Sequence, residues 1–136
     1  MDYHIKSKAF KVLDEFLLVN LQQKSTGLPM VIWARERAGN RHGPRLEVSR
    51  THRHRISARN TVSVTVSNCP KVIPTTDFLK PKDFELVRRF ILMNKSILQA
   101  HWKREIDTLE FCNRMIKYSE EVWAEFVINH PEFQRR

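Results

Sequence analysis

Glycine is scarce in this chain, and its scarcity excludes several familiar phosphate-binding loops. The 136 residues include three glycines, Gly27, Gly39 and Gly43. Their spacing matches neither a P-loop nor the glycine-rich turn of dinucleotide-binding folds. A nucleotide held by such a loop is therefore excluded, and we expect no cofactor.

Cysteine pairs and long apolar runs are also lacking. Cys69 and Cys112 stand alone without a Cys-x-x-Cys spacing, which favours a reduced, cytoplasmic protein. A disulfide between these two residues stays open as the alternative. No apolar stretch approaches the length that spans a membrane, and residues 1–6 lack the charged-then-apolar layout of a signal peptide. We therefore expect no membrane contact.

What the chain has in excess is arginine. Its formal net charge is +9 and its isoelectric point is near 10, which favours polyanions as partners. Much of this charge falls in residues 35–59, where eight arginines and three histidines face only Glu36 and Glu47 and no lysine occurs. These basic residues are Arg35, Arg37, Arg41, His42, Arg45, Arg50, His52, Arg53, His54, Arg55 and Arg59.

The leading hypothesis is a small basic protein that binds nucleic acid, either DNA or RNA. Planar guanidinium groups suit phosphate oxygens in both geometry and charge. The eight arginines lie on two connections that flank a strand near residues 46–48, and we expect these connections to converge at one end of the sheet. Trp33, just before the first arginine, is a candidate for stacking on a base.

A second hypothesis, from another class, is a metal-independent ribonuclease, with a toxin-like role. A histidine as general base and acid, with arginines neutralising the phosphorane, is enough to cleave RNA through its own 2′-hydroxyl. The candidate catalytic residues are His42, His52 and His54, with Glu47 as the orienting carboxylate and Arg45, Arg53 or Arg55 as charge stabilisers.

Two further alternatives remain open. The basic connections could clamp the acidic surface of a protein, as an adaptor or inhibitor does, and a homodimer is compatible with the sequence. His52 and His54 could also share a metal if His42 or Cys69 supplied a third ligand. Because the neighbouring guanidinium groups would repel a dication, we predict no metal site.

The hydrophobic patterns predict a single α+β domain over residues 1–136. A helical stripe predicts an N-terminal helix over 6–23, although the run at 16–19 is also compatible with a buried strand. The sheet is expected within residues 30–73, with the alternating segment 61–67 as its clearest strand. C-terminal helices are expected over 82–129. The result is a small antiparallel sheet of three to four strands, packed on one face by two or three helices.

The C-terminal helices have recognisable ends and faces. Pro81 and Asp83 favour the start of the first, and Asp107 or Thr108 can cap a last helix that ends before Pro131. Asn94 lies within an apolar stripe, so we expect a buried amide bonded to backbone. Trp102 and Trp123 lie on apolar faces and are predicted to join the core.

A pattern in residues 30–116 resembles a family of short bacterial proteins of unknown function. That family combines a small sheet bearing Pro-His-x-His with a helix ending in Leu-Leu-x-x-Trp. Here Phe84-Glu85-Leu86-Val87 leads through Asn94-Lys95-Ser96-Ile97-Leu98 to Trp102, with Gln99 at the second leucine, and His42-Gly43-Pro44-Arg45 stands at the histidine motif. The resemblance implies a bacterial or phage setting near toxin–antitoxin or mobile-element genes, and it supplies no activity.

Overall fold

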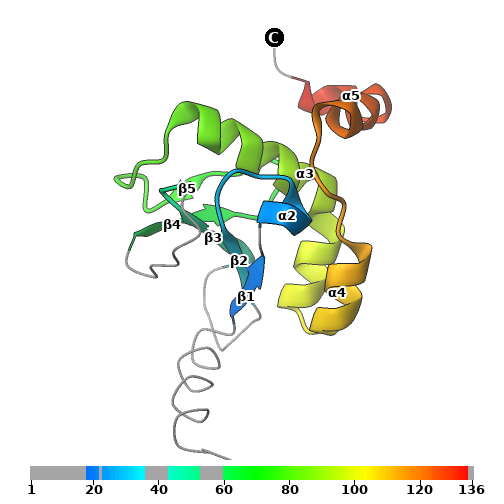
Figure 1. Cartoon of the computed structure of the whole chain (residues 1–136), viewed down its shortest axis with the longest axis horizontal. Coiled ribbons are helices and arrows are strands. Elements are labelled where there is room, and N and C mark those ends of the chain that lie inside the picture. The colour runs from blue at the N-terminus through cyan, green and yellow to red at the C-terminus, as the bar shows by residue number, and fades with distance from the viewer. Residues whose placement is uncertain (1–17, 22, 36–42, 53–59, 135–136) are drawn as a thin grey trace, which may run out of the picture.

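The fold is built on an antiparallel sheet whose strands follow one another in chain order (Figure 1). The computed structural model describes residues 18–21, 23–35, 43–52 and 60–134. Helices cover one face of the sheet, which confirms the predicted α+β class. The strands are β1 (Leu18–Leu21), β2 (Ile32–Arg35), β3 (Arg45–Ser49), β4 (Thr61–Thr65) and β5 (Val72–Ile73), and the helices are α2 (Gln23–Thr26), α3 (Pro81–Trp102), α4 (Thr108–Arg114), α5 (Glu120–Asn129) and the 3-10 turn η1 (Pro131–Phe133).

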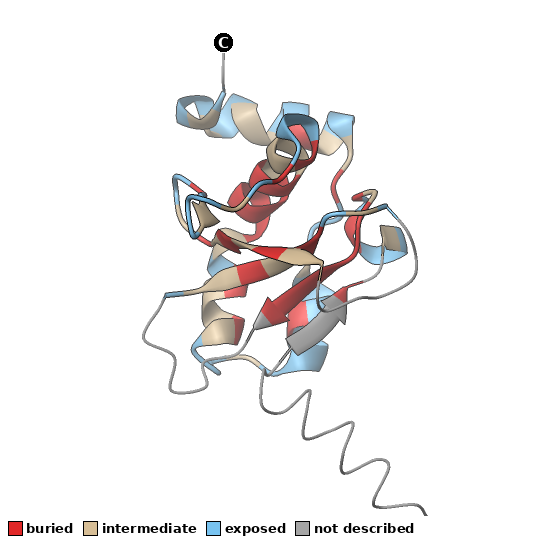
Figure 2. Ribbon diagram, turned by 90° about the vertical axis from the view of Figure 1, so that its left-hand side faces the viewer, coloured by how far each residue is buried: buried red, intermediate tan, exposed pale blue. Residues whose placement is uncertain are grey.

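Alternation along the central strands separates a fully buried apolar face from a half-buried, mostly polar one. Leu46 and Val48 of β3 lie opposite Val64 and Val62 of β4, and all four side chains are buried. They pack in one core cluster with the buried apolar residues of α3. Figure 2 shows buried stretches both in the sheet and in the helices. Each fully buried aliphatic side chain contributes about 1.5–3 kcal/mol through removal from water. The opposite sheet face carries the alternate residues, which are mostly polar.

The N-terminal helix predicted for residues 6–23 is wrong for residues 18–21. These four residues form β1, which pairs antiparallel with β2 from Leu18 opposite Arg35 to Leu21 opposite Ile32. Pairing with β2 satisfies backbone groups along that strand, and this long-range gain outweighs the weak local preference for helix. Residues 6–17 and residue 22 lie outside the described residues, and the short helix α2 begins at Gln23.

Helix α3 forms as the sequence predicts. Pro81 occupies its first turn, where a missing N–H costs nothing, and Asp83 adds a carboxylate near the positive end of the helix dipole. Two apolar stripes bury against the sheet and against α4 and α5, which lie on α3 in Figure 1. Trp123 of α5 is buried, whereas Trp102 at the end of α3 is partly exposed.

The last predicted helix is in fact two helices, α4 and α5. Its start is confirmed, because the Asp107 side chain accepts a hydrogen bond from the N–H of Glu110 at 2.8 Å. The helix then stops at Arg114, and Ser119 caps a new one by accepting from the N–H of Val122. Extended backbone at residue 115 divides them.

Asn94 explains the break between α4 and α5. Its amide donates to the carbonyl of Ile116 at 3.0 Å and its oxygen accepts from the N–H of the same residue at 2.7 Å. A third bond, to the carbonyl of Phe90 at 3.1 Å, completes the amide. The prediction that Asn94 is buried and bonded to backbone is confirmed. Backbone that pairs with this side chain cannot continue a helical ladder.

The same segment is tied to α2 through a close backbone approach at Gly27. The N–H of Tyr118 donates to the carbonyl of Thr26 at 2.7 Å. Gly27 has a φ of +78°, and a Cβ there would collide with the carbonyl oxygen of Tyr118. Glycine is therefore required at this position both by backbone conformation and by space.

Candidate nucleic-acid interface

The basic residues singled out above fall partly within the described structure. Trp33, Arg35, Arg45, Glu47, Arg50 and His52 belong to it, whereas Arg37, Arg41, His42, Arg53, His54, Arg55 and Arg59 lie outside the described residues. The described residues on either side of each of these two segments nevertheless fix where the chain leaves the sheet and where it returns. Those flanks decide whether the arginines gather in one place.

The two arginine-rich connections leave β3 at opposite ends. Arg45 pairs with Thr65 at one end of the strand, and Ser49 pairs with Thr61 at the other. Beyond the second end, the N–H of Arg50 donates to the carbonyl of Asn60 at 3.0 Å. A strand of this length separates its ends by roughly 13 Å, since each residue adds about 3.3 Å.

The predicted convergence of the two connections at one sheet end is therefore wrong. In an antiparallel meander each connection reverses the chain, so successive connections alternate between the two ends of the middle strand. Four arginines belong to residues 35–45 at one end and four to residues 50–59 at the other. We name these the 35–45 end and the 50–60 end.

Glu47 lies on the half-buried, mostly polar face of the sheet, between the two ends. Its carboxylate accepts hydrogen bonds from the Ser63 hydroxyl at 2.8 and 2.9 Å, and Arg45 Nε lies 3.7 Å from Oε1. The contacts follow from the register, because Glu47 faces Ser63 across the β3–β4 ladder. This carboxylate therefore partly neutralises the 35–45 end.

Trp33 lies beside Glu47, opposite it in the β2–β3 register. Its side chain is buried, with 5% of the residue exposed. Stacking on a base needs an open ring face. The burial of this ring counts against the stacking role predicted for it.

The 50–60 end lies beside the N-terminal end of α3. There, two acidic side chains contact the basic residues Arg50 and His52. Arg50 lies 3.7 Å from Oδ1 of Asp77, in the connection before α3. His52 Nε2 lies 3.0 Å from Oδ1 and 3.1 Å from Oδ2 of Asp83, in the first turn of α3. The carboxylate that contacts His52 is therefore Asp83 and not Glu47.

The backbone of this corner is fastened as well. The side chain of Gln23 in α2 donates to the carbonyl of His52 at 3.2 Å and also to that of Pro29. The Ser49 hydroxyl donates to the carbonyl of Thr51 at 3.1 Å. The side chains of Gln23 and Ser49 thus hold the backbone of residues 51 and 52 in place.

Asp77 and Asp83 are the site residues that sequence reasoning did not find. Asp83 was expected to stabilise the start of α3, and it also serves as the partner of His52. A signal does exist in the sequence, because these are the first two acidic residues after Glu47. Predicting that these carboxylates contact Arg50 and His52 requires knowing that α3 begins beside the 50–60 end of the sheet. That is a property of the tertiary structure.

The described residues offer no set of ligands for the metal site considered above. Among residues 18–21, 23–35, 43–52 and 60–134 there is no cluster of three or more His, Cys, Asp or Glu side chains suited to a metal. Cys69, offered above as a ligand, is exposed, and neither it nor Cys112 is in a disulfide.

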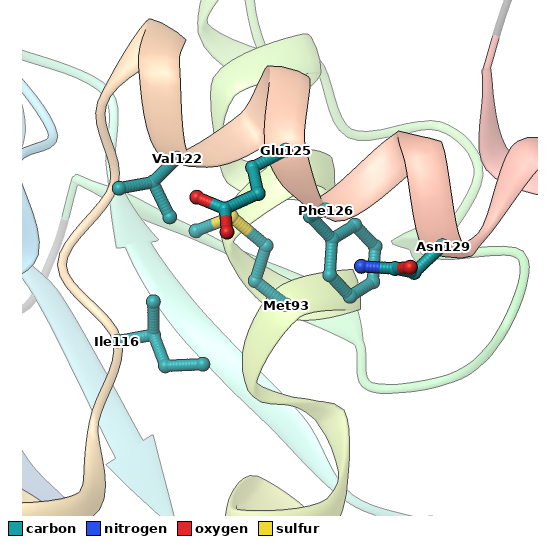
Figure 3. Close-up of a pocket in the computed structure, with 6 residues that line it drawn as sticks. All are labelled: Met93, Ile116, Val122, Glu125, Phe126 and Asn129. Atoms are coloured by element: carbon teal, nitrogen blue, oxygen red, sulfur yellow. The ribbon is translucent and has the colours of Figure 1, made fainter.

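A separate hollow of about 210 Å³ lies between α3 and α5. Figure 3 shows its lining: Met93, Ile116, Val122, Glu125, Phe126 and Asn129. Met93 comes ten residues after Asp83 on α3, so the two sites are roughly 15 Å apart along the helix. The lining is mainly apolar with one carboxylate, which does not suit a phosphate.

Comparison with protein-family models, curated proteins and solved structures finds no match for this chain. The resemblance to short bacterial proteins therefore stays a prediction. No helix in the described part of the chain is both long and apolar enough to cross a membrane.

Proposed function

We propose that this protein binds nucleic acid through phosphate contacts at the 50–60 end of its sheet. The observation that carries the proposal is the distribution of charge that the strand register reveals. From residue 48 to residue 76 the chain has no Asp or Glu, while the connection between β3 and β4 contains Arg50, Arg53, Arg55 and Arg59. Such a surface attracts phosphates and releases their counterions.

The 35–45 end is the weaker candidate, although it has the same number of arginines. Glu36 and Glu47 lie within or beside that stretch, and Glu47 is 3.7 Å from Arg45. At the 50–60 end the only described carboxylates belong to other elements, Asp77 and Asp83. These anchor Arg50 and His52 and leave Arg53, Arg55 and Arg59 without an acidic neighbour in sequence.

Two double variants test the proposal, because they remove equal charge from the two ends. Arg53→Gln with Arg55→Gln acts on the 50–60 end, and Arg37→Gln with Arg41→Gln is the matched control. Binding of a labelled single-stranded RNA and of a DNA duplex is measured by fluorescence anisotropy between about 50 and about 200 mM salt.

We expect the affinity of the unchanged protein to fall as a power of salt concentration. Each lost phosphate contact should reduce the magnitude of the log–log slope by about 0.7–0.9. The variant at 53 and 55 should therefore lose more slope than the variant at 37 and 41. Affinity that does not depend on salt, or equal losses in both variants, would contradict the assignment. Nuclease-resistant retention of a stoichiometric acidic protein would favour the adaptor alternative.

We further propose a cytoplasmic location. Cys69 and Cys112 are both free thiols, which agrees with a reducing compartment. Localisation of a tagged full chain by microscopy and fractionation tests this part of the proposal.

A further inference from the structure

The pairing of His52 with Asp83 has the geometry of a histidine positioned for proton transfer. Both carboxylate oxygens of Asp83 face the same ring nitrogen, Nε2, at 3.0 and 3.1 Å. A carboxylate can only accept, so Nε2 carries the hydrogen. In the neutral ring the lone pair then belongs to Nδ1, on the side away from Asp83.

The two side chains of the pair differ in burial: Asp83 is buried, and His52 is accessible to solvent. The Asp83 side chain is 6% exposed and that of His52 is 54% exposed. A buried carboxylate on a rigid helix, bonded to one nitrogen of a half-exposed imidazole, sets the tautomer and the direction of the ring. The Gln23 bond to the carbonyl of His52 fixes the backbone behind it.

We propose that His52 is the general base of an RNA-cleaving centre and that Asp83 is its positioning residue. The inference rests on the proposed function, because the RNA must first be held at the 50–60 end. Arg50, two residues before the histidine, supplies positive charge for the phosphate, and its partner Asp77 lies 3.7 Å away.

The reaction is an internal transfer that needs no oxidant, reductant or added group. His52 Nδ1 takes the proton of a ribose 2′-hydroxyl while the 2′ oxygen forms a bond to the adjacent phosphorus. The bond from phosphorus to the 5′ oxygen breaks, and that oxygen receives the proton from His52 or through water. The products are a 2′,3′-cyclic phosphate and a 5′-hydroxyl. Arg50 offsets the extra negative charge on the phosphorane.

The test uses the full chain, a labelled single-stranded RNA, and the same sequence as DNA. We expect cleavage of the RNA only, with 2′,3′-cyclic phosphate ends identified by mass spectrometry. His52→Gln should lower the rate by at least roughly 100-fold, whereas the matched His130→Gln, at the end of α5, should keep it. A single 2′-deoxy substitution at the cleaved nucleotide should block cleavage there.

The positioning role has its own readout. Asp83→Asn should lower kcat for RNA cleavage by roughly 10-fold and leave KM for the RNA unchanged, because the imidazole loses the carboxylate that orients it while the arginines that hold the RNA stay in place. If Asp83→Asn does not fold, judged by circular dichroism, the His52→Gln and 2′-deoxy results decide.

The outcomes separate this inference from the proposed function. RNA that is bound with a salt-dependent affinity but stays intact overturns the catalytic assignment and leaves the binding function standing. Cleavage that persists in His52→Gln, or that also cuts DNA, overturns it as well. Absence of any nucleic-acid binding overturns the proposed function, and the inference with it.

Discussion

Arg89, in the helical half of the molecule, has more and closer partners than Arg45 and Arg50 at the two sheet ends. Arg89 of α3 donates to Glu85 at 3.0 Å, to the Tyr118 hydroxyl at 2.9 Å and to Glu120 at 3.2 Å. The carboxylate contacts described for Arg45 and Arg50 are both 3.7 Å long. Net charge alone does not distinguish these groups, but their surroundings do.

The difference indicates separate roles for cations that look alike in the sequence. The Arg89 guanidinium also lies over the ring of Trp123, 5.2 Å from its centre, so it joins α3 to α5 by several contacts at once. Arginines used in this way stabilise the fold and are not available to a ligand. At the 50–60 end, the described contact of Arg50 is a single one of 3.7 Å to Asp77, so this guanidinium is held less tightly within the fold than that of Arg89.

The largest effect that would test this contrast is expected for Asn94→Ala. The substitution removes three hydrogen bonds within the helical half, and the N–H and carbonyl of Ile116 lose their partner side chain. We expect the free energy of unfolding to fall by about 2–4 kcal/mol, measured by urea denaturation. Nucleic-acid affinity at a temperature where the variant is folded should not change.

Ser96→Ala provides the control for Asn94. Ser96 lies two residues further along α3 and is exposed. Its substitution should change the free energy of unfolding by less than about 0.5 kcal/mol. If Asn94→Ala were equally mild, the helical half would not depend on internal polar contacts as the comparison requires.

A direct comparison of two arginines gives the next largest effect. Arg89→Gln loses bonds to Glu85, Tyr118 and Glu120, and we expect a loss of about 1–2 kcal/mol in unfolding free energy. Arg50→Gln loses one long, exposed contact to Asp77 and should cost less than about 0.5 kcal/mol.

For RNA affinity, we expect the opposite order of effects in these two variants. Arg50→Gln is expected to weaken RNA affinity and reduce the salt slope, whereas Arg89→Gln should leave both unchanged. Thermal denaturation and anisotropy on the same preparations give both quantities. A binding loss in Arg89→Gln as large as that in Arg50→Gln would remove the distinction between the two regions.

The sequence predicts what depends on local pattern. Alternation of valine with hydroxyl residues identified β4, two apolar stripes identified α3, and the Asp107 side chain was expected as a cap. The buried amide of Asn94 was also predictable, because a polar residue inside an apolar stripe must find a partner. Each of these inferences needs only a few neighbouring residues.

What the sequence does not reveal depends on pairing between distant segments. Residues 18–21 became a strand because β2 offered a free edge, and the last helix broke because Asn94 and Thr26 bonded its backbone. The partner of His52 depends on where α3 begins relative to β3. That the two arginine-rich connections lie at opposite ends of β3 follows only when β2, β3 and β4 are known to pair in chain order.

The smallest of the expected effects concerns Tyr118 and alkaline pH. Burial raises the pKa of the Tyr118 hydroxyl above its usual value, the hydrogen bond that it donates to Glu120 raises it further, and the Arg89 guanidinium acts in the opposite direction. Burial lowers the pKa of Arg89, but its bonds to Glu85 and Tyr118 outweigh this and raise it overall, so Arg89 stays charged.

The sign of the stability change follows from proton binding. Since the pKa of Tyr118 is higher in the folded state, the folded chain retains a proton that the unfolded chain releases above about pH 10. This contribution to stability is complete below that pH and is lost as pH rises through the pKa of the folded state. In Tyr118→Phe the group is absent, so the variant is less stable at neutral pH but its stability should fall less steeply above about pH 10. Guanidinium denaturation of both proteins across this range measures the difference, in which the titration of lysines common to both cancels. A constant difference between the two curves would show that Tyr118 does not carry this coupling, and the helical network would then rest on its arginine and carboxylate contacts alone.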